Sequence, residues 1–138
     1  MGHNGHMRSL GTLEYDPKLS AQRPADPWWL IVRTCEETRR YYAAQVGAHL
    51  GQKLNKPLWG SHITVVRGEQ PSVRRRGAWG LHQRRVISFD FEWRGLNNHR
   101  GIWWLPVKSK ALENIRVELG LDPRPAVAFH WTLGRVCG

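Results

Sequence analysis

The pattern of apolar and polar positions predicts a strand–helix–strand unit in the first half of the chain. The run WWLIVRTC, residues 28–35, is apolar enough for a buried strand. Thr34 and Glu37 have the spacing of a capping box, which predicts a helix from there to about Leu54. KPLWG ends this helix, and SHITVVRGE, residues 61–69, follows as a second strand. The apolar stripe of the helix, at a spacing of four, consists of Tyr42, Val46, Leu50 and Leu54.

A second unit of the same order follows in the second half. Residues 86–93 (VISFDFEW) alternate as a strand, and the turn GLNNHRG joins them to IWWLPVK, residues 102–108, as a hairpin. Ser109 can cap a helix, and Gly120 and Pro123 are predicted to end it. AVAFHWTLGRV, residues 126–136, is predicted to be the last strand. The stripe of the second helix consists of Leu112, Ile115 and Leu119.

The remaining segments have weaker patterns. Residues 1–27 contain scattered Gly, Asn and Pro, which predict a flexible leader with LEYDP, residues 13–17, as a candidate short edge strand. Residues 70–85 are arginine-rich without a clear period, so they form either a phosphate-attracting flap or a solvated connection. We therefore expect a leader over 1–27 and a single domain over 28–138.

The strand that closes each unit carries a histidine and a threonine two positions apart. These pairs are His62 with Thr64 in GSHITVVRG and His130 with Thr132 in FHWTLGR. Residues two apart in a strand project from the same face. If the two closing strands lie side by side across a pseudo-twofold axis, both pairs converge on one cleft. Two solvated strand faces with structural histidines are the alternative, but the repeat on equivalent strands favours a site.

This set of side chains suits phosphoester chemistry. Two opposed imidazoles can remove one proton and donate another, because the pKa of histidine lies near neutrality. Threonine hydroxyls can donate hydrogen bonds to phosphate oxygens. Acidic residues are scarce nearby, and Cys35 and Cys137 form no C-x-x-C pair, so we expect neither a metal nor another cofactor.

Charge and composition add a preference for polyanions. The 138 residues include 21 Lys and Arg against 11 Asp and Glu, a net charge of +10, together with 8 tryptophans. Such an excess attracts phosphate groups, and interleaved aromatic rings can stack on bases. The apolar runs are too short to span a bilayer and no signal peptide is evident, so we expect a cytoplasmic protein. Nothing indicates a membrane or an obligate protein partner.

The doubled H-x-T segments resemble the two-histidine (2H) phosphoesterase superfamily, which carries such a motif on each of two lobes. The resemblance covers residues 28–136. It implies an α+β, bilobal fold, with two pseudo-symmetric lobes of antiparallel sheet, flanking helices and a central cleft. It also implies a metal-independent phosphodiesterase in which His62 and His130 are acid and base and Thr64 and Thr132 clamp the phosphate.

Within that superfamily, LWGSHITVVRGE, IWWLPVK and FHWTLGR look most like phage anti-CBASS enzymes. Those enzymes cleave cyclic oligonucleotide second messengers of bacterial immunity. The resemblance implies attack of a ribose 2′-hydroxyl on a 3′–5′ phosphodiester, through a 2′,3′-cyclic phosphate, in the host cytoplasm. The division of acid and base between the two histidines stays open here.

Five further side chains are candidates for holding the substrate. Trp29, Trp93 and Trp104 are possible stacking platforms, each with a core position as the alternative. Arg67 and Arg135 follow the two motifs, but strict alternation turns both away from the histidines.

Two other functions fit the same sequence. The first is an RNA-processing phosphodiesterase for 2′,3′-cyclic ends or 2′–5′ linkages, which the charge favours. The second is a non-catalytic RNA-binding module that uses the tryptophans and the arginines of 70–85. The module predicts that His→Ala substitutions leave its function intact.

Overall fold

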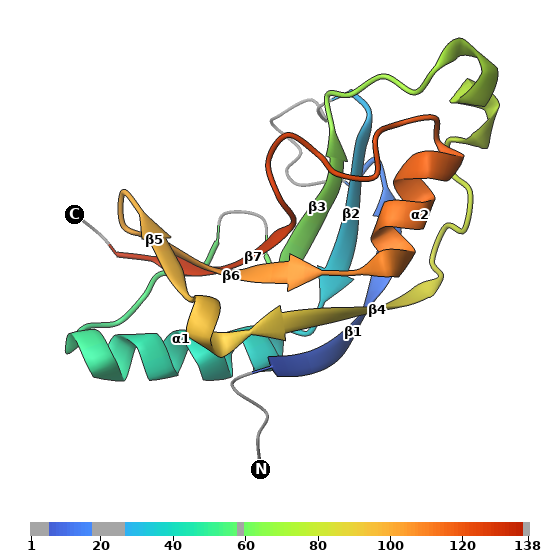
Figure 1. Ribbon diagram of the computed structural model, residues 1–138. Coiled ribbons are helices and arrows are strands. Elements are labelled where there is room, and N and C mark those ends of the chain that lie inside the picture. Colours follow the sequence, from blue (N-terminus) through green and yellow to red (C-terminus); the bar gives the residue numbers. More distant parts are fainter. Residues whose placement is uncertain (1–5, 18–26, 58–59, 137–138) are drawn as a thin grey trace.

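The computed structural model describes residues 6–17, 27–57 and 60–136 of the chain (Figure 1). Two α-helices, two short 3₁₀ helices and seven strands occur in these ranges. In chain order they are β1 (His6–Tyr15), β2 (Trp29–Thr34), α1 (Glu36–Leu50), β3 (His62–Arg67), η1 (Val73–Ala78), β4 (Val86–Glu92), η2 (Trp93–Gly95), β5 (Asn97–His99), β6 (Ile102–Lys108), α2 (Lys110–Glu118) and β7 (His130–Arg135).

The strands form one antiparallel sheet that closes on itself. Their order is β4-β1-β2-β3-β7-β6-β5, and β4 also pairs with β6, which completes a closed barrel. The predicted α+β class is thereby confirmed. The strands of the two halves are nevertheless continuous, because β3 pairs directly with β7. In Figure 1 the sheet has two arms, one around β2 and β3 and one around β5, β6 and β7.

The two predicted strand–helix–strand units are confirmed, and their strands pair in the same register. Helix α1 connects β2 to β3, and α2 connects β6 to β7. In each unit the register skips one residue of the closing strand, Val65 in β3 and Leu133 in β7, which is a β-bulge. The matched cross-strand pairs are Trp29–Arg67 with Ile102–Arg135, Leu30–Val66 with Trp103–Gly134, and Val32–Ile63 with Leu105–Trp131.

The first helix differs from its prediction at both ends. Its N-cap is Cys35, and the predicted capping box does not form because the Thr34 hydroxyl hydrogen-bonds Ser61 instead. The helix ends at Leu50, since Gly51 adopts a left-handed conformation with φ of 73°. Leu54 is still buried, but it lies beyond the helix. In α2 the predicted cap is confirmed, because the Ser109 hydroxyl accepts a hydrogen bond from the Leu112 amide at 3.2 Å.

The structure corrects the prediction of a leader for the part of residues 1–27 that it describes. Residues 6–15 form β1, which pairs with β4 on one edge and β2 on the other and is therefore not an edge strand. Burial alternates along the strand, with Leu13 and Tyr15 buried, but the apolar Leu10 lies on the outward face and is 58% exposed, so apolar and polar residues do not alternate in the sequence. Residues 1–5 and 18–26 lie outside the described residues.

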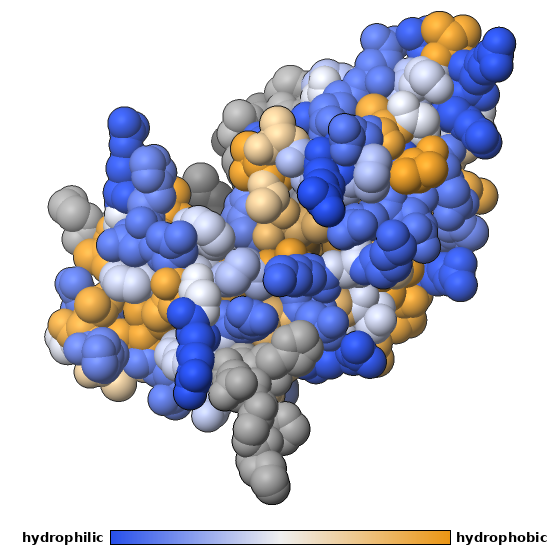
Figure 2. Space-filling model, viewed as in Figure 1, coloured by the Kyte–Doolittle hydropathy of each residue, from blue (hydrophilic) through white to orange (hydrophobic). Residues whose placement is uncertain are grey.

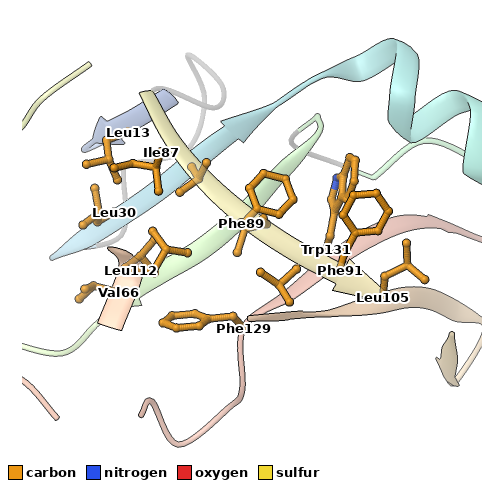
Figure 3. Close-up of a cluster of buried hydrophobic side chains, with 14 of the residues drawn as sticks. Leu13, Leu30, Val66, Ile87, Phe89, Phe91, Leu105, Leu112, Phe129 and Trp131 are labelled. Carbon is orange, nitrogen blue, oxygen red and sulfur yellow. The ribbon is translucent and has the colours of Figure 1, made fainter. Parts of the chain in front are cut away.

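The core lies inside the closed sheet and beneath α2 (Figure 3). Phe89 and Phe91 of β4 meet the fully buried Trp131 edge to face, with ring centroids 5.7 and 5.2 Å apart. The predicted stripe of α2 packs against this cluster. Because Ile63 and Trp131 point into the core, the residues on either side of each must project from the opposite face.

No helix within the described ranges is long and apolar enough to cross a membrane. The arginine-rich segment contains the short helix η1 rather than only a loop.

Candidate active site

The two histidine–threonine pairs lie beside each other, as predicted, because β3 and β7 are neighbours in the sheet. Ile63 pairs with Trp131 in antiparallel register. One residue to either side, this register sets His62 opposite Thr132 and Thr64 opposite His130. A local twofold axis therefore relates the two motifs.

A cavity of about 570 Å³ opens over this part of the sheet. All four predicted catalytic residues line it, and so do Arg67 and Arg135. Its apolar wall comes from Ile102 and the segment 125–127. On the face shown in Figure 2, apolar side chains gather near the middle of a mostly hydrophilic surface. The volume lies within the range of small-molecule sites.

Both histidine rings are oriented by the same backbone contact. Nδ1 of His62 lies 3.0 Å from the Gly60 carbonyl oxygen, and Nδ1 of His130 lies 2.9 Å from the Ala128 carbonyl oxygen. A carbonyl can only accept, so Nδ1 carries the proton and donates it in each contact. In the neutral ring, Nε2 is then the nitrogen with the free electron pair. Both imidazoles can accept a proton at Nε2 or, once protonated, return one from it.

The surroundings of the two histidines differ. Burial lowers the pKa of His62, and the positive charges of Arg33, His130 and Arg67 lower it further, against the opposing effect of the hydrogen bond to Gly60. His130 lies beside the ring of Trp104, at a centroid distance of 5.6 Å, and His62 lies beside the ring of Trp29, at 6.2 Å. Each histidine thus has an aromatic neighbour, and the two differ in the residue across the strand pair, which is Arg33 for His62 and Pro106 for His130.

The prediction from strict alternation, which turned Arg67 and Arg135 away from the histidines, is wrong. Both arginines line the same cavity as the histidines, because the bulges at Val65 and Leu133 each insert one residue and reverse the alternation beyond them. The guanidinium of Arg67 also lies 4.8 Å from the centroid of the Trp29 ring. A spacing shared by both motifs, H-x-T-x-x-R, was the available signal for these arginines.

The three predicted tryptophans have three different placements. Trp29 is 1% exposed, and its indole N–H donates to the Thr64 hydroxyl at 3.4 Å, so it is a buried neighbour of the site. Trp104 lies beside His130, next to the cavity. Trp93 is not brought to the site: it packs against Tyr42, with a centroid distance of 5.3 Å, and it lines a separate cavity.

The cavity therefore combines two proton-transfer groups with two hydroxyl donors and two guanidinium groups. Charge-assisted hydrogen bonds from guanidinium groups suit phosphate oxygens, and the imidazoles suit proton transfer at oxygen. Within the described ranges, no three His, Cys, Asp or Glu side chains gather in a way that could hold a metal ion. No protein-family model, curated protein or solved structure matches the chain.

Proposed function

We propose that this protein is a 2H-type, metal-independent phosphodiesterase that hydrolyses 3′–5′ bonds of cyclic oligonucleotide second messengers. Its role would be to counter CBASS immunity in the cytoplasm of a bacterial host. The observation that carries the proposal is the matched pair of histidines, each with Nδ1 on a carbonyl two residues earlier and both on one cavity. The repeated strand register supports two pseudo-symmetric lobes of the 2H kind.

In this mechanism His62 is the first base. Its lowered pKa keeps the ring neutral near neutral pH, so Nε2 accepts the proton of a ribose 2′-hydroxyl. The 2′-oxygen attacks phosphorus, and the 5′-oxygen leaves with a proton from Nε2 of His130. A 2′,3′-cyclic phosphate and a free 5′-hydroxyl result. For hydrolysis the roles reverse: His130 accepts a proton from water, and protonated His62 donates one to the departing 2′-oxygen.

The remaining groups of the cavity suit a compact nucleotide. Thr64 and Thr132 donate hydrogen bonds to non-bridging phosphate oxygens, and Arg67 and Arg135 neutralise negative charge. The apolar wall formed by Ile102 and residues 125–127 offers a surface for a base.

The direct test is an assay in excess EDTA with separated substrate classes. Cyclic di- and trinucleotides, 2′,3′-cyclic AMP and single-stranded RNA are incubated with the parent protein, and products are separated by chromatography. His62→Ala and His130→Ala are compared with His99→Ala, a matched control on the exposed strand β5. We expect the parent and the control to linearise the cyclic oligonucleotides, and each site variant to lose about 100-fold to 10,000-fold in rate.

Other outcomes separate the candidate functions. If only RNA or 2′,3′-cyclic ends are turned over, the two-histidine mechanism stands, but the proposed cyclic oligonucleotide substrate is wrong. Absence of turnover, combined with RNA binding that neither histidine substitution changes, overturns the enzyme proposal in favour of a binding module.

An RNA substrate is the second candidate, favoured by the arginines of the segment 73–85. Arg74, Arg75 and Arg76 in η1 and Arg84 and Arg85 beyond it are exposed. Such a surface attracts a long polyanion, and its affinity falls steeply with salt. If RNA is the substrate, Arg74→Gln/Arg75→Gln weakens RNA binding and flattens its salt dependence. Hydrolysis of 2′,3′-cyclic AMP stays unchanged in that variant.

A further inference from the structure

Two arginines lie in the interior of the molecule, one on each α-helix. Arg39 of α1 is 2% exposed, and Arg116 of α2 is 0% exposed. Each guanidinium binds both carboxylate oxygens of a glutamate: Arg39 binds Glu36 at 2.8 and 2.6 Å, and Arg116 binds Glu69 at 2.8 and 2.8 Å. Burying a guanidinium group destabilises the fold unless its N–H donors are hydrogen-bonded. The partners of the remaining N–H groups therefore show what each arginine holds.

Each arginine also donates to the backbone of a motif strand. Nη1 of Arg39 donates to the Leu133 carbonyl at 2.5 Å, and Nη1 of Arg116 donates to the Val65 carbonyl at 2.9 Å. Val65 and Leu133 are the bulge residues, which the strand registers skip. Each stands three positions after the motif histidine, so the same carbonyl is held in the same way in both halves.

The two contacts cross between the halves. Arg39 belongs to the helix that joins β2 to β3, yet it holds β7, 94 residues away in the sequence. Arg116 belongs to the helix that joins β6 to β7, yet it holds β3, 51 residues away. The helices pack accordingly, α1 on β7 and α2 on β3. Each motif strand thus depends on the helix of the other half.

The bulges decide which side chains share the cavity. In an unbroken strand, residues 62, 64 and 66 share a face, and Arg67 points into the core. The bulge reverses this order, and Val65 and Val66 are both buried while Arg67 lines the cavity. The carbonyl of each bulge residue accepts a hydrogen bond from the buried arginine.

We infer that Arg39 and Arg116 are positioning residues. Each holds the bulge of the motif strand in the opposite half and so sets the placement of that half's histidine, threonine and arginine. The consequence for catalysis rests on the proposed function, whereas the consequence for histidine placement does not.

The test uses NMR spectra of the imidazole rings in protein labelled with ¹⁵N-histidine, with signals assigned through His62→Gln and His130→Gln. Arg116→Met and Arg39→Met remove the guanidinium and keep an unbranched apolar stem. Exposed residues on the same helices provide the controls: Lys110→Met on α2, whose side chain is 82% exposed, and Gln45→Met on α1, which is also exposed. We expect a crossed result. Arg116→Met shifts the imidazole signals of His62 and leaves those of His130 unchanged, whereas Arg39→Met shifts the signals of His130 and leaves those of His62 unchanged.

A second readout follows activity on whichever substrate the parent turns over. Misplacement of catalytic groups lowers kcat more than it changes KM, and we expect a loss of about 100-fold in kcat for each Met variant. The controls should stay within about twofold of the parent. Loss of activity without the crossed shifts, or shifts in the histidine of the same half, overturns the inference.

The two proposals fail separately. If the parent has no turnover but the Met variants show the crossed shifts, the proposed function is wrong and the positioning role stands. If the parent turns over a substrate but the Met variants show no crossed shifts, the proposed function stands and the positioning role is wrong. Should a Met variant fail to fold, Arg116→Lys and Arg39→Lys replace it, because they keep a buried cation and lose the forked geometry. The crossed pattern is required of them as well.

Discussion

The histidines differ in their neighbours although their motifs repeat. In the strand pairs, Arg33 lies across from His62, and Pro106 lies across from His130. Burial is the largest cause of the lowered pKa of His62, and the nearby cations lower it further, so both favour the neutral form that a base requires. This difference between single residues is the physical basis for assigning His62 as the first base.

The assignment predicts a pH dependence. His62 must be neutral to accept a proton, so kcat/KM falls as the pH drops through its pKa, which lies below the ordinary value of 6.5. Arg33→Gln removes a positive charge, which raises the pKa of His62 and moves the acid limb of the profile to higher pH. Profiles of kcat/KM for the parent, Arg33→Gln and the exposed control Arg94→Gln test this. An acid limb that stays in place or moves to lower pH contradicts it.

The two cavity arginines give a second prediction at this scale. Arg67→Gln and Arg135→Gln each remove a charged donor from the phosphate site, and we expect kcat/KM to fall about tenfold to a hundredfold in either variant. Arg94→Gln again serves as the control. If both substitutions leave the kinetics unchanged, the two arginines line the cavity without contacting the phosphate, and this prediction is wrong.

At the scale of elements, the local sequence pattern predicted the strands and the helix cap that depend only on neighbouring residues. The strands β2, β3, β4, β6 and β7 and the capped helix α2 follow from periodicity and from Ser109. The predicted capping box does not form because the Thr34 hydroxyl is hydrogen-bonded to the hydroxyl of Ser61, which is distant in sequence. The bulges at Val65 and Leu133 depend on arginines from the opposite half, which no periodicity reveals.

One difference between the repeated strands yields a prediction for stability. Gly134 in β7 corresponds to Val66 in β3, and a Cβ at Gly134 would lie 2.6 Å from the backbone oxygen of Asn55. Asn55 and Arg135 exchange backbone hydrogen bonds there at 2.8 and 3.0 Å, so this backbone has little freedom to retreat. Gly134→Val should lower the free energy of unfolding by about 1–3 kcal/mol, measured by chemical denaturation.

The matched control for that substitution is Gly77→Ala. A Cβ at Gly77 meets nothing within 4 Å, and its stability should match the parent. If Gly134→Val is as stable as the parent, the backbone at Asn55 does not restrict the space beside Gly134, and the prediction is wrong.

At the scale of the whole molecule, the closed sheet and the crossed helices join both halves into one framework. The convergence of the two motifs was predictable because it needs only two equivalent strands side by side. The place of β1 was not, since partners on both edges hold that strand despite exposed apolar residues such as Leu10. Closure through β4 and β6 is likewise a long-range pairing without a local pattern.

The central claim is that two distant histidines act as one catalytic pair. The most direct measurement is kcat/KM in excess EDTA for the parent, His62→Ala, His130→Ala and the double variant, on the substrate that the parent cleaves. Groups that act as a unit give strongly non-additive losses, so we predict that the double variant is about as slow as either single variant. Losses that multiply in the double variant, or activity that survives either substitution, would contradict the claim.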